Sequence, residues 1–138
     1  MTSAQIVSHV RDRGAPATIV NVWATWCGPC REEFPDLVKF QRDWRERGVE
    51  VMYVSADFDD QLEAVEKFLD SHGVDGPTYL KNETDMKFID GLDRRWSGAL
   101  PATFVYDRTG KLVRYWEGRA DYARFVAAAE AAVQGGGR

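Results

Sequence analysis

The pattern of apolar and polar positions divides the first half of the chain into alternating helices and strands. Apolar residues recur at helical spacing over 3–13, and Gly14 then ends this short amphipathic helix. Residues 17–24 are apolar at all but two positions, which is typical of a strand buried on both faces of a sheet. A longer helix is predicted over 27–47, and 49–55 has the composition of a second strand. Strand, helix and strand in this order form one right-handed βαβ unit.

An insert of about 57–96 follows the second strand and is predicted to be mainly helical. Apolar residues at helical spacing indicate one helix over 59–71 and a shorter helix over 83–90. A short extended piece is expected between the two helices, at 78–80. The insert therefore separates the βαβ unit from the last part of the chain.

That last part predicts a β-hairpin and a closing helix. Residues 102–106 and 112–116 are strand-like and flank the turn sequence at 107–110. An alanine-rich amphipathic helix is expected over 121–133, capped by the aspartate at its first position, and the glycines after it predict a flexible tail over 134–138. The fold class is therefore α/β: a central mixed β-sheet, built as βαβ and then ββα, flanked by helices, with the helical insert between its halves.

Length and composition agree with this interpretation and exclude several classes of function. The chain has 138 residues, of which 44% are hydrophobic and 12% aromatic, so we expect a single domain over 1–138 with a real core. The net charge is -4 and no extended basic stretch is present, so a nucleic-acid partner is not expected. No apolar run approaches the ~20 residues of a membrane-spanning helix. We expect a monomer without a membrane span.

The first thirteen residues bear on the cellular compartment. They have no apolar core and no small-residue cleavage site, so we do not interpret them as a signal peptide. On this evidence the protein is cytoplasmic if the chain is complete, and extracytoplasmic if a leader has been removed.

The two cysteines carry most of the functional signal, in the sequence Cys27-Gly28-Pro29-Cys30. A structural zinc site needs four ligands, and His9 and His72 lack zinc-finger spacing, so no metal site is predicted. Haem attachment would need histidine after the second cysteine, where the chain has Arg31. A redox pair fits better, because a cysteine at a helix start has its thiol pKa lowered to somewhere between about 3.5 and 7.5. We expect Cys27 to be the exposed nucleophile and Cys30 the shielded resolving thiol.

Several segments resemble the thioredoxin superfamily. Residues 22–30, Val-Trp-Ala-Thr-Trp-Cys-Gly-Pro-Cys, are similar to its active-site segment, and Phe34-Pro35 is similar to the kinked continuation of its active-site helix. Residues 98–104 resemble the loop whose proline is cis in that family, and Glu117-Gly118 resembles the glycine turn before its final helix. The resemblance implies the thioredoxin fold over nearly the whole chain.

Within the superfamily the chain is most similar to the TlpA/ResA-like branch of thiol-disulfide oxidoreductases. Asn21, the continuation at 31–35, the insert and the Pro-x-Thr-Phe pattern at Pro101 carry this similarity. The branch usually has an extra β-hairpin before its first core strand and an export signal or membrane anchor, and we expect neither within these 138 residues. By resemblance the compartment is extracytoplasmic or periplasmic.

The resemblance also implies roles for the residues around the sulfurs. Trp26 should flank the sulfurs and contact substrate together with Gly28 and Pro29, although Trp26 could instead serve core packing. A cis bond before Pro101 would turn the backbone of Leu100 toward the cysteines, where it could pair with an extended substrate segment. The alternative for Pro101 is an ordinary trans proline that starts a strand.

Asn21 leaves the proton acceptor for the resolving thiol open. Typical thioredoxins have a buried aspartate at this position, and an asparagine cannot titrate, so another acid or water must take the proton. We favour Asp57, because it follows the C-terminal end of the second strand, with a cap or solvated loop residue as its alternative role. The other candidates are Glu32, Glu33, Asp59 and Asp60.

We therefore predict an enzyme that reduces protein disulfides through the Cys27–Cys30 dithiol. It would need no cofactor beyond that redox-active pair, and its partners would be protein disulfide or dithiol substrates and an upstream electron-donor protein. A reducing direction is expected because Gly28-Pro29 between the cysteines resembles reducing thioredoxins. The alternatives are a disulfide oxidase or isomerase of the same fold, a copper-binding chaperone, a peroxidase and a non-catalytic adaptor.

Overall fold

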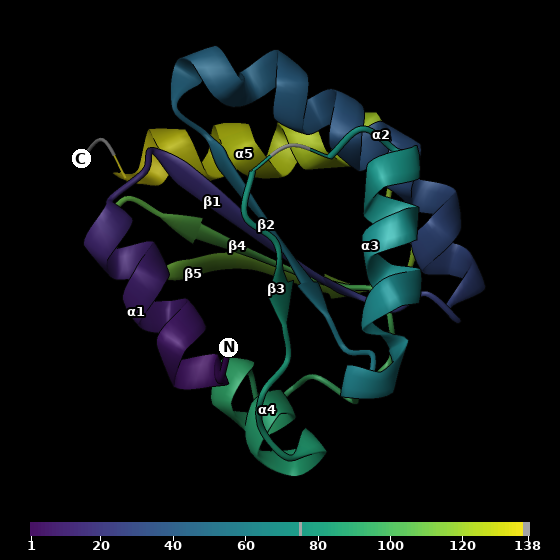
Figure 1. The fold of residues 1–138 in the computed structure, drawn as a ribbon. Coiled ribbons are helices and arrows are strands. Elements are labelled where there is room, and N and C mark those ends of the chain that lie inside the picture. Colours follow the sequence, from purple (N-terminus) through teal and green to yellow (C-terminus); the bar gives the residue numbers. More distant parts are fainter. Residues whose placement is uncertain (75, 137–138) are drawn as a thin grey trace.

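The computed structural model describes residues 1–74 and 76–136 and contains a five-stranded mixed sheet (Figure 1). Its strand order is β3-β2-β1-β4-β5. The central strand β1 pairs in parallel with β2 and antiparallel with β4, which in turn pairs antiparallel with β5. The bounds of the strands are β1 Ala17–Trp23, β2 Glu50–Ser55, β3 Tyr79–Leu80, β4 Ala102–Asp107 and β5 Leu112–Glu117.

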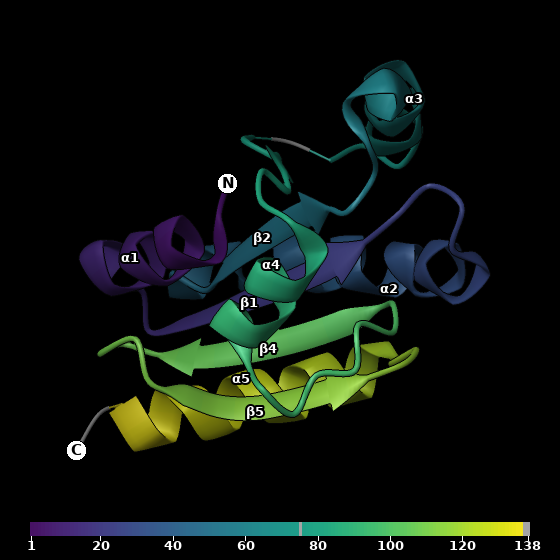
Figure 2. The same cartoon turned by 90° about the horizontal axis from the view of Figure 1, so that it is seen from below.

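Helices cover both faces of this sheet. Figure 2 shows α1 and α4 on one face and α2 and α5 on the other. Side chains of α3 pack into the core on the α2 side. The bounds are α1 Ser3–Arg13, α2 Gly28–Trp44, α3 Leu62–Ser71, α4 Asp85–Leu92 and α5 Tyr122–Gly136, with short 3-10 helices at η1 Arg45–Arg47 and η2 Asp59–Gln61. The predicted α/β class, with βαβ and ββα halves around an insert, is confirmed.

The strand β1 lies at the centre of both cores, and all seven of its residues are buried. Ile19 and Trp23 pack against the helices α2 and α5, whereas Val20 and Val22 face α1 and α4. Successive side chains of a strand point to opposite faces, so Asn21 lies on the α2 side with Ile19 and Trp23. This register places a buried amide beneath the helix that starts at the cysteines.

Several helix boundaries differ from our predictions. The helix predicted over 27–47 ends as η1, the helix predicted over 59–71 begins as η2 and continues as α3, and the helix predicted over 83–90 is Asp85–Leu92. The extended piece expected at 78–80 forms the short edge strand β3. The last helix runs to Gly136, three residues beyond its predicted end. The tail that we predicted to be flexible from 134 is therefore helical through 136, and 137–138 lie outside the described residues. Among the residues that the structure describes, no helix has the length and apolarity needed to cross a membrane.

Candidate active site

The junction between β1 and α2 places Cys27 at the start of the helix. Cys27 is the N-cap of α2 in extended conformation, and its sulfur accepts a hydrogen bond from the Cys30 amide at 3.2 Å. Its own amide donates to the carbonyl of Ala24 at 3.2 Å, which holds the turn that leaves the strand. The sulfur therefore occupies the place where the first amides of a helix stabilise negative charge.

Cys30 lies one turn further along and is bonded to Cys27 in a disulfide with a Cα–Cα distance of 5.3 Å. Cys30 has no exposed surface, as we expected of a shielded resolving thiol. Cys27 is only 6% exposed, so it is less accessible than the exposed nucleophile that we predicted. Because Cys27 keeps this small exposed area and Cys30 keeps none, an incoming reactant reaches the sulfur of Cys27 first.

Three residues next to the cysteines face solvent. The indole of Trp26 is 68% exposed, so it does not serve core packing. Gly28 and Pro29 are exposed in the first turn of α2, and a Cβ at Gly28 would meet no atom within 4 Å. Trp26, Gly28 and Pro29 therefore form an exposed rim next to Cys27.

The loop before β4 carries Pro101, and the Leu100–Pro101 peptide bond is cis, as the resemblance implies. The carbonyl of Pro101 accepts a hydrogen bond of 2.8 Å from the amide of Gly118, whose φ of 96° favours glycine. Within the described part of the chain, the amide and carbonyl of Leu100 have no hydrogen-bond partner. The backbone at Leu100 is therefore free to bind an added segment.

Asp57, which we favoured as proton acceptor, ties the end of β2 to the loop before Cys27. It is buried, and its carboxylate accepts from the Thr25 amide at 3.0 Å, the Thr25 hydroxyl at 2.6 Å and the Ser55 hydroxyl at 2.6 Å. These donors occupy both carboxylate oxygens. The geometry therefore gives Asp57 a structural function in holding the loop.

A second buried carboxylate, Glu33, lies one turn after Cys30 on the inner side of α2. It is 1% exposed, and its oxygens accept from the Asn21 side-chain amide and from the Ala120 backbone amide, each at 2.9 Å. Burial raises the pKa of Glu33, and the hydrogen bonds from Ala120 and Asn21, with the charge of Arg119, offset only part of that rise. Glu33 is thus a buried group that holds a proton more readily than an exposed glutamate.

The amide of Asn21 completes this polar cluster. Its nitrogen donates to Glu33 and, at 3.3 Å, to the hydroxyl of Thr103 on β4. Its oxygen is buried and has no hydrogen-bond partner among the residues that the structure describes. We named Glu33 only as one of several acids, although spacing could have selected it: Cys30, Glu33, Phe34 and Leu37 recur at helical spacing, so Glu33 lies on the buried stripe of α2. No spacing or motif in the sequence indicated that the hydroxyl of Thr103 would bind Asn21.

A metal site is not built into the parts of the chain that the structure describes. No group of three histidine, cysteine, aspartate or glutamate side chains gathers there to hold an ion.

A central strand followed by a disulfide-bonded Cys-x-x-Cys pair at a helix start, together with a cis-proline loop before an antiparallel strand, defines a thioredoxin-fold protein. Comparison with known proteins assigns the family: residues 4–115 match the AhpC/TSA family, to which the chain belongs.

The relatives of this chain are thiol-disulfide oxidoreductases. It is 33% identical over 106 residues to the thiol-disulfide oxidoreductase ResA of Bacillus subtilis. The aligned region covers 77% of this chain and 55% of that protein. The ResA of Halalkalibacterium halodurans is 28% identical over 110 residues, covering 80% of this chain and 58% of that protein. The chain thus spans a little more than half the length of these curated relatives.

Solved structures confirm the fold. A thiol:disulfide interchange protein of the thioredoxin family from Chlorobium tepidum superposes with a TM-score of 0.75 at 28% identity, covering 91% of this chain and 83% of that chain. A thioredoxin-related protein from Neisseria meningitidis gives a TM-score of 0.68 at 28% identity, covering 87% of each chain.

Replacing Asp57 tests its structural function. Asp57→Ala leaves the Thr25 amide and the Thr25 and Ser55 hydroxyls without their acceptor, so we expect the free energy of unfolding to fall by about 2 to 4 kcal/mol. Urea denaturation of the oxidised protein measures it. The matched control is Asp59→Ala at an exposed position, which should stay within about 0.5 kcal/mol. A similarly small effect of Asp57→Ala would show that these hydrogen bonds do not hold the loop.

The raised pKa of Glu33 predicts a pH dependence of stability. Between the ordinary pKa and the raised folded-state pKa, the folded protein keeps a proton that the unfolded chain has lost, so stability falls as pH rises through this window. Glu33→Gln removes the group that holds this proton. As pH increases, the free energy of unfolding of the wild type should therefore fall relative to that of Glu33→Gln. Urea denaturation from pH 4 to 8 measures it, with the exposed Glu32→Gln as control. Parallel profiles for wild type and Glu33→Gln would contradict the assignment.

Proposed function

We propose that this protein is a thiol-disulfide oxidoreductase that reduces disulfides in proteins. The observation that carries the proposal is the position of the Cys27 sulfur, which caps the first turn of α2, accepts the Cys30 amide and is bonded to Cys30 within that turn. The helix terminus stabilises the Cys27 thiolate, and the second thiol is already within reach of it. A metal or an organic cofactor has no part in this chemistry.

The reaction consists of two exchanges. In the reduced protein the Cys27 thiolate attacks one sulfur of the substrate disulfide, a mixed disulfide forms, and the other substrate sulfur leaves as a thiolate. Cys30 then loses its proton and attacks the Cys27 sulfur, which forms the Cys27–Cys30 disulfide and releases the second substrate thiolate. Two electrons have passed to the substrate. The oxidised state in the structure is the product of this cycle, and an upstream electron-donor protein must reduce it again.

Glu33 replaces Asp57 as our proposed proton acceptor for Cys30. It lies one turn after Cys30 on the same buried side of α2, and its raised pKa makes it a stronger base than an exposed glutamate, which favours uptake of a thiol proton. Asn21 and Ala120 orient it by hydrogen bonds to its two oxygens. The oxygens of Asp57, by contrast, are committed to Thr25 and Ser55.

The exposed surroundings of Cys27 favour a polypeptide substrate. The unpaired backbone of Leu100 can pair with an extended segment, and Trp26 can lie against that segment beside the reacting sulfur. Following the resemblance, we place the reaction outside the cytoplasm, where protein disulfides form and persist.

Trapping of the mixed disulfide tests the reaction. Cys30→Ser removes the thiol that releases substrate, so the variant should accumulate a covalent complex through Cys27 with a disulfide-containing protein such as insulin. Non-reducing electrophoresis and mass spectrometry measure the complex. Cys27→Ser should form none, and wild type should reduce insulin with dithiothreitol as electron donor. The mechanism would be contradicted if Cys27→Ser formed a complex through Cys30. It would also be contradicted if wild type reduced insulin no faster than Cys27→Ser does.

The reduction potential tests the direction. Because Gly28 and Pro29 resemble the residues between the cysteines of reducing thioredoxins, we expect a potential well below the value of about -120 mV that characterises the strong oxidant DsbA. Equilibration with glutathione redox buffers, followed by alkylation and mass spectrometry, measures it. A potential near -120 mV would make the protein an oxidase.

A further inference from the structure

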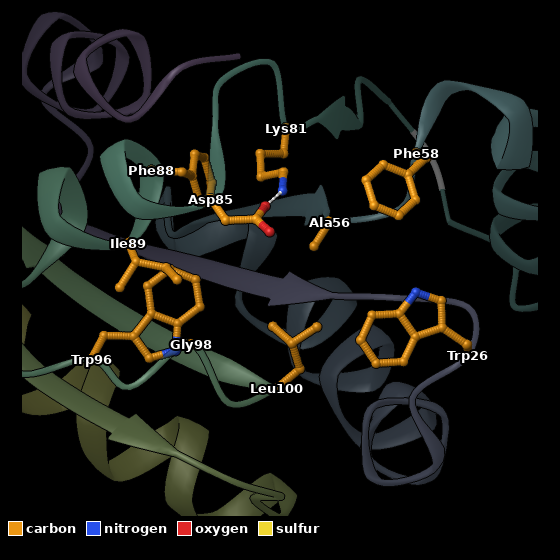
Figure 3. Close-up of a pocket in the computed structure, with 10 residues that line it drawn as sticks. All are labelled: Trp26, Ala56, Phe58, Lys81, Asp85, Phe88, Ile89, Trp96, Gly98 and Leu100. Atoms are coloured by element: carbon orange, nitrogen blue, oxygen red, sulfur yellow. Dashed lines mark hydrogen bonds and ion pairs between the residues drawn. The ribbon is translucent and has the colours of Figure 1, made fainter.

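An apolar cavity opens next to the cysteine pair, between the insert and the cis-proline loop. Its volume is about 160 Å³, and its lining is mainly carbon (Figure 3). Trp26 and Phe58 form one end, Ala56 and Leu100 lie in the middle, and Ile89 and Trp96 lie at the far end. An engineered apolar cavity of about 150 Å³ binds benzene, so this space is large enough for one aromatic ring or one leucine side chain.

The rim of this cavity exposes more apolar surface than a surface without a partner requires. Trp26 is 68% exposed and Phe58 is 71% exposed, and both line the opening. Large apolar side chains gathered around one opening mark a site where another molecule binds.

Two residues of the cavity also belong to the proposed substrate site. Trp26 is adjacent to Cys27 in the chain, and Leu100 carries the unpaired backbone groups beside Pro101. An extended segment that pairs with Leu100 while its cysteine reaches Cys27 therefore passes the mouth of the cavity. Because such a segment advances about 3.3 Å per residue, a side chain within a few positions of its cysteine can enter.

An acidic groove continues from the cavity along the start of α4. Phe58, Lys81 and Asp85 line both, and Asp59 and Glu83 add further carboxylates to the groove. Asp85 forms an ion pair with Lys81, the groove's only cation within the described part of the chain. The remaining charge is negative, which favours basic side chains on a bound segment.

We propose that this cavity and groove select the substrate, which is an extended polypeptide segment with a large apolar side chain close to its reacting cysteine and basic residues beyond it. The apolar side chain fills the cavity between Trp26 and α4, and the basic residues lie along the acidic groove. This inference rests on the proposed function, since it assigns the substrate class of the same site.

Peptide disulfides test the inference. Each peptide carries one cysteine blocked by 5-thio-2-nitrobenzoate, a good leaving group whose release is coloured, with either phenylalanine or alanine beside the cysteine. Single-turnover reaction with the reduced protein gives a rate constant for each peptide. We expect the phenylalanine peptides to react about tenfold faster than the alanine peptides, because hydrophobic pockets discriminate by at least this factor. Peptides with lysines flanking the cysteine should react faster than peptides with glutamates there, and this difference in rate should vanish at about 1 M salt.

Two variants and one control locate the effect. Ala56→Leu fills the middle of the cavity and should bring the ratio of phenylalanine to alanine rates close to one. Phe58→Ala removes an exposed wall and should lower the same ratio without disturbing the core. Val133→Ala, at a half-exposed apolar position on α5 far from the cysteines, should leave the ratio unchanged.

The outcomes separate this inference from the proposed function. Equal rates for phenylalanine and alanine peptides in wild type, or a ratio that neither cavity variant changes, would overturn the inference while the oxidoreductase stands. If wild type released 5-thio-2-nitrobenzoate from every peptide no faster than Cys27→Ser does, both the inference and the proposed function would be overturned. Sedimentation velocity supplies a further check, because a dimer that Phe58→Ala dissociates would show that a second copy of this chain covers the cavity.

Discussion

The arrangement depends on a strand that ends where a helix begins, with a sulfur as the helix cap. The strand β1 is buried on both faces, so packing against the two cores fixes its position and therefore the place where the chain leaves the sheet. The sulfur of Cys27 then accepts the Cys30 amide in the first turn of α2, at the position where a serine or an aspartate side chain is the usual cap. The ionisation of Cys27 that we propose rests on this placement, and Asp57 holds the loop that leads to it.

The two faces of the sheet contribute different parts of the site. The face covered by α2 and α5 buries Glu33 against Asn21 and the Ala120 amide, which isolates a titratable carboxylate from solvent below the cysteines. The face covered by α1 and α4 leaves a cavity open beside Trp26. In our proposal, one side of the sheet supplies the proton acceptor and the other side binds the substrate.

The elements and the reactive pair could be predicted from the sequence because their signals are local. A strand buried on both faces has continuous apolar composition, and Cys-x-x-Cys at a helix start has few chemical uses. Glu33 was harder to select than Asp57, because its partner amide at Ala120 is 87 positions away and only the folded chain brings the two together. The cavity could not be predicted at all, since it arises where the insert helix α4 meets the end of β2 and the loop at Leu100.

The most direct test of this account is the pH dependence of alkylation of the reduced protein, with the labelled cysteine identified by mass spectrometry. We expect iodoacetamide to modify Cys27 selectively, with an apparent thiol pKa between about 3.5 and 7.5, while Cys30 stays unmodified. The claim that the helix terminus makes Cys27 the reactive sulfur would be contradicted if the Cys27 thiol remained protonated well above pH 8, or if both cysteines were labelled equally.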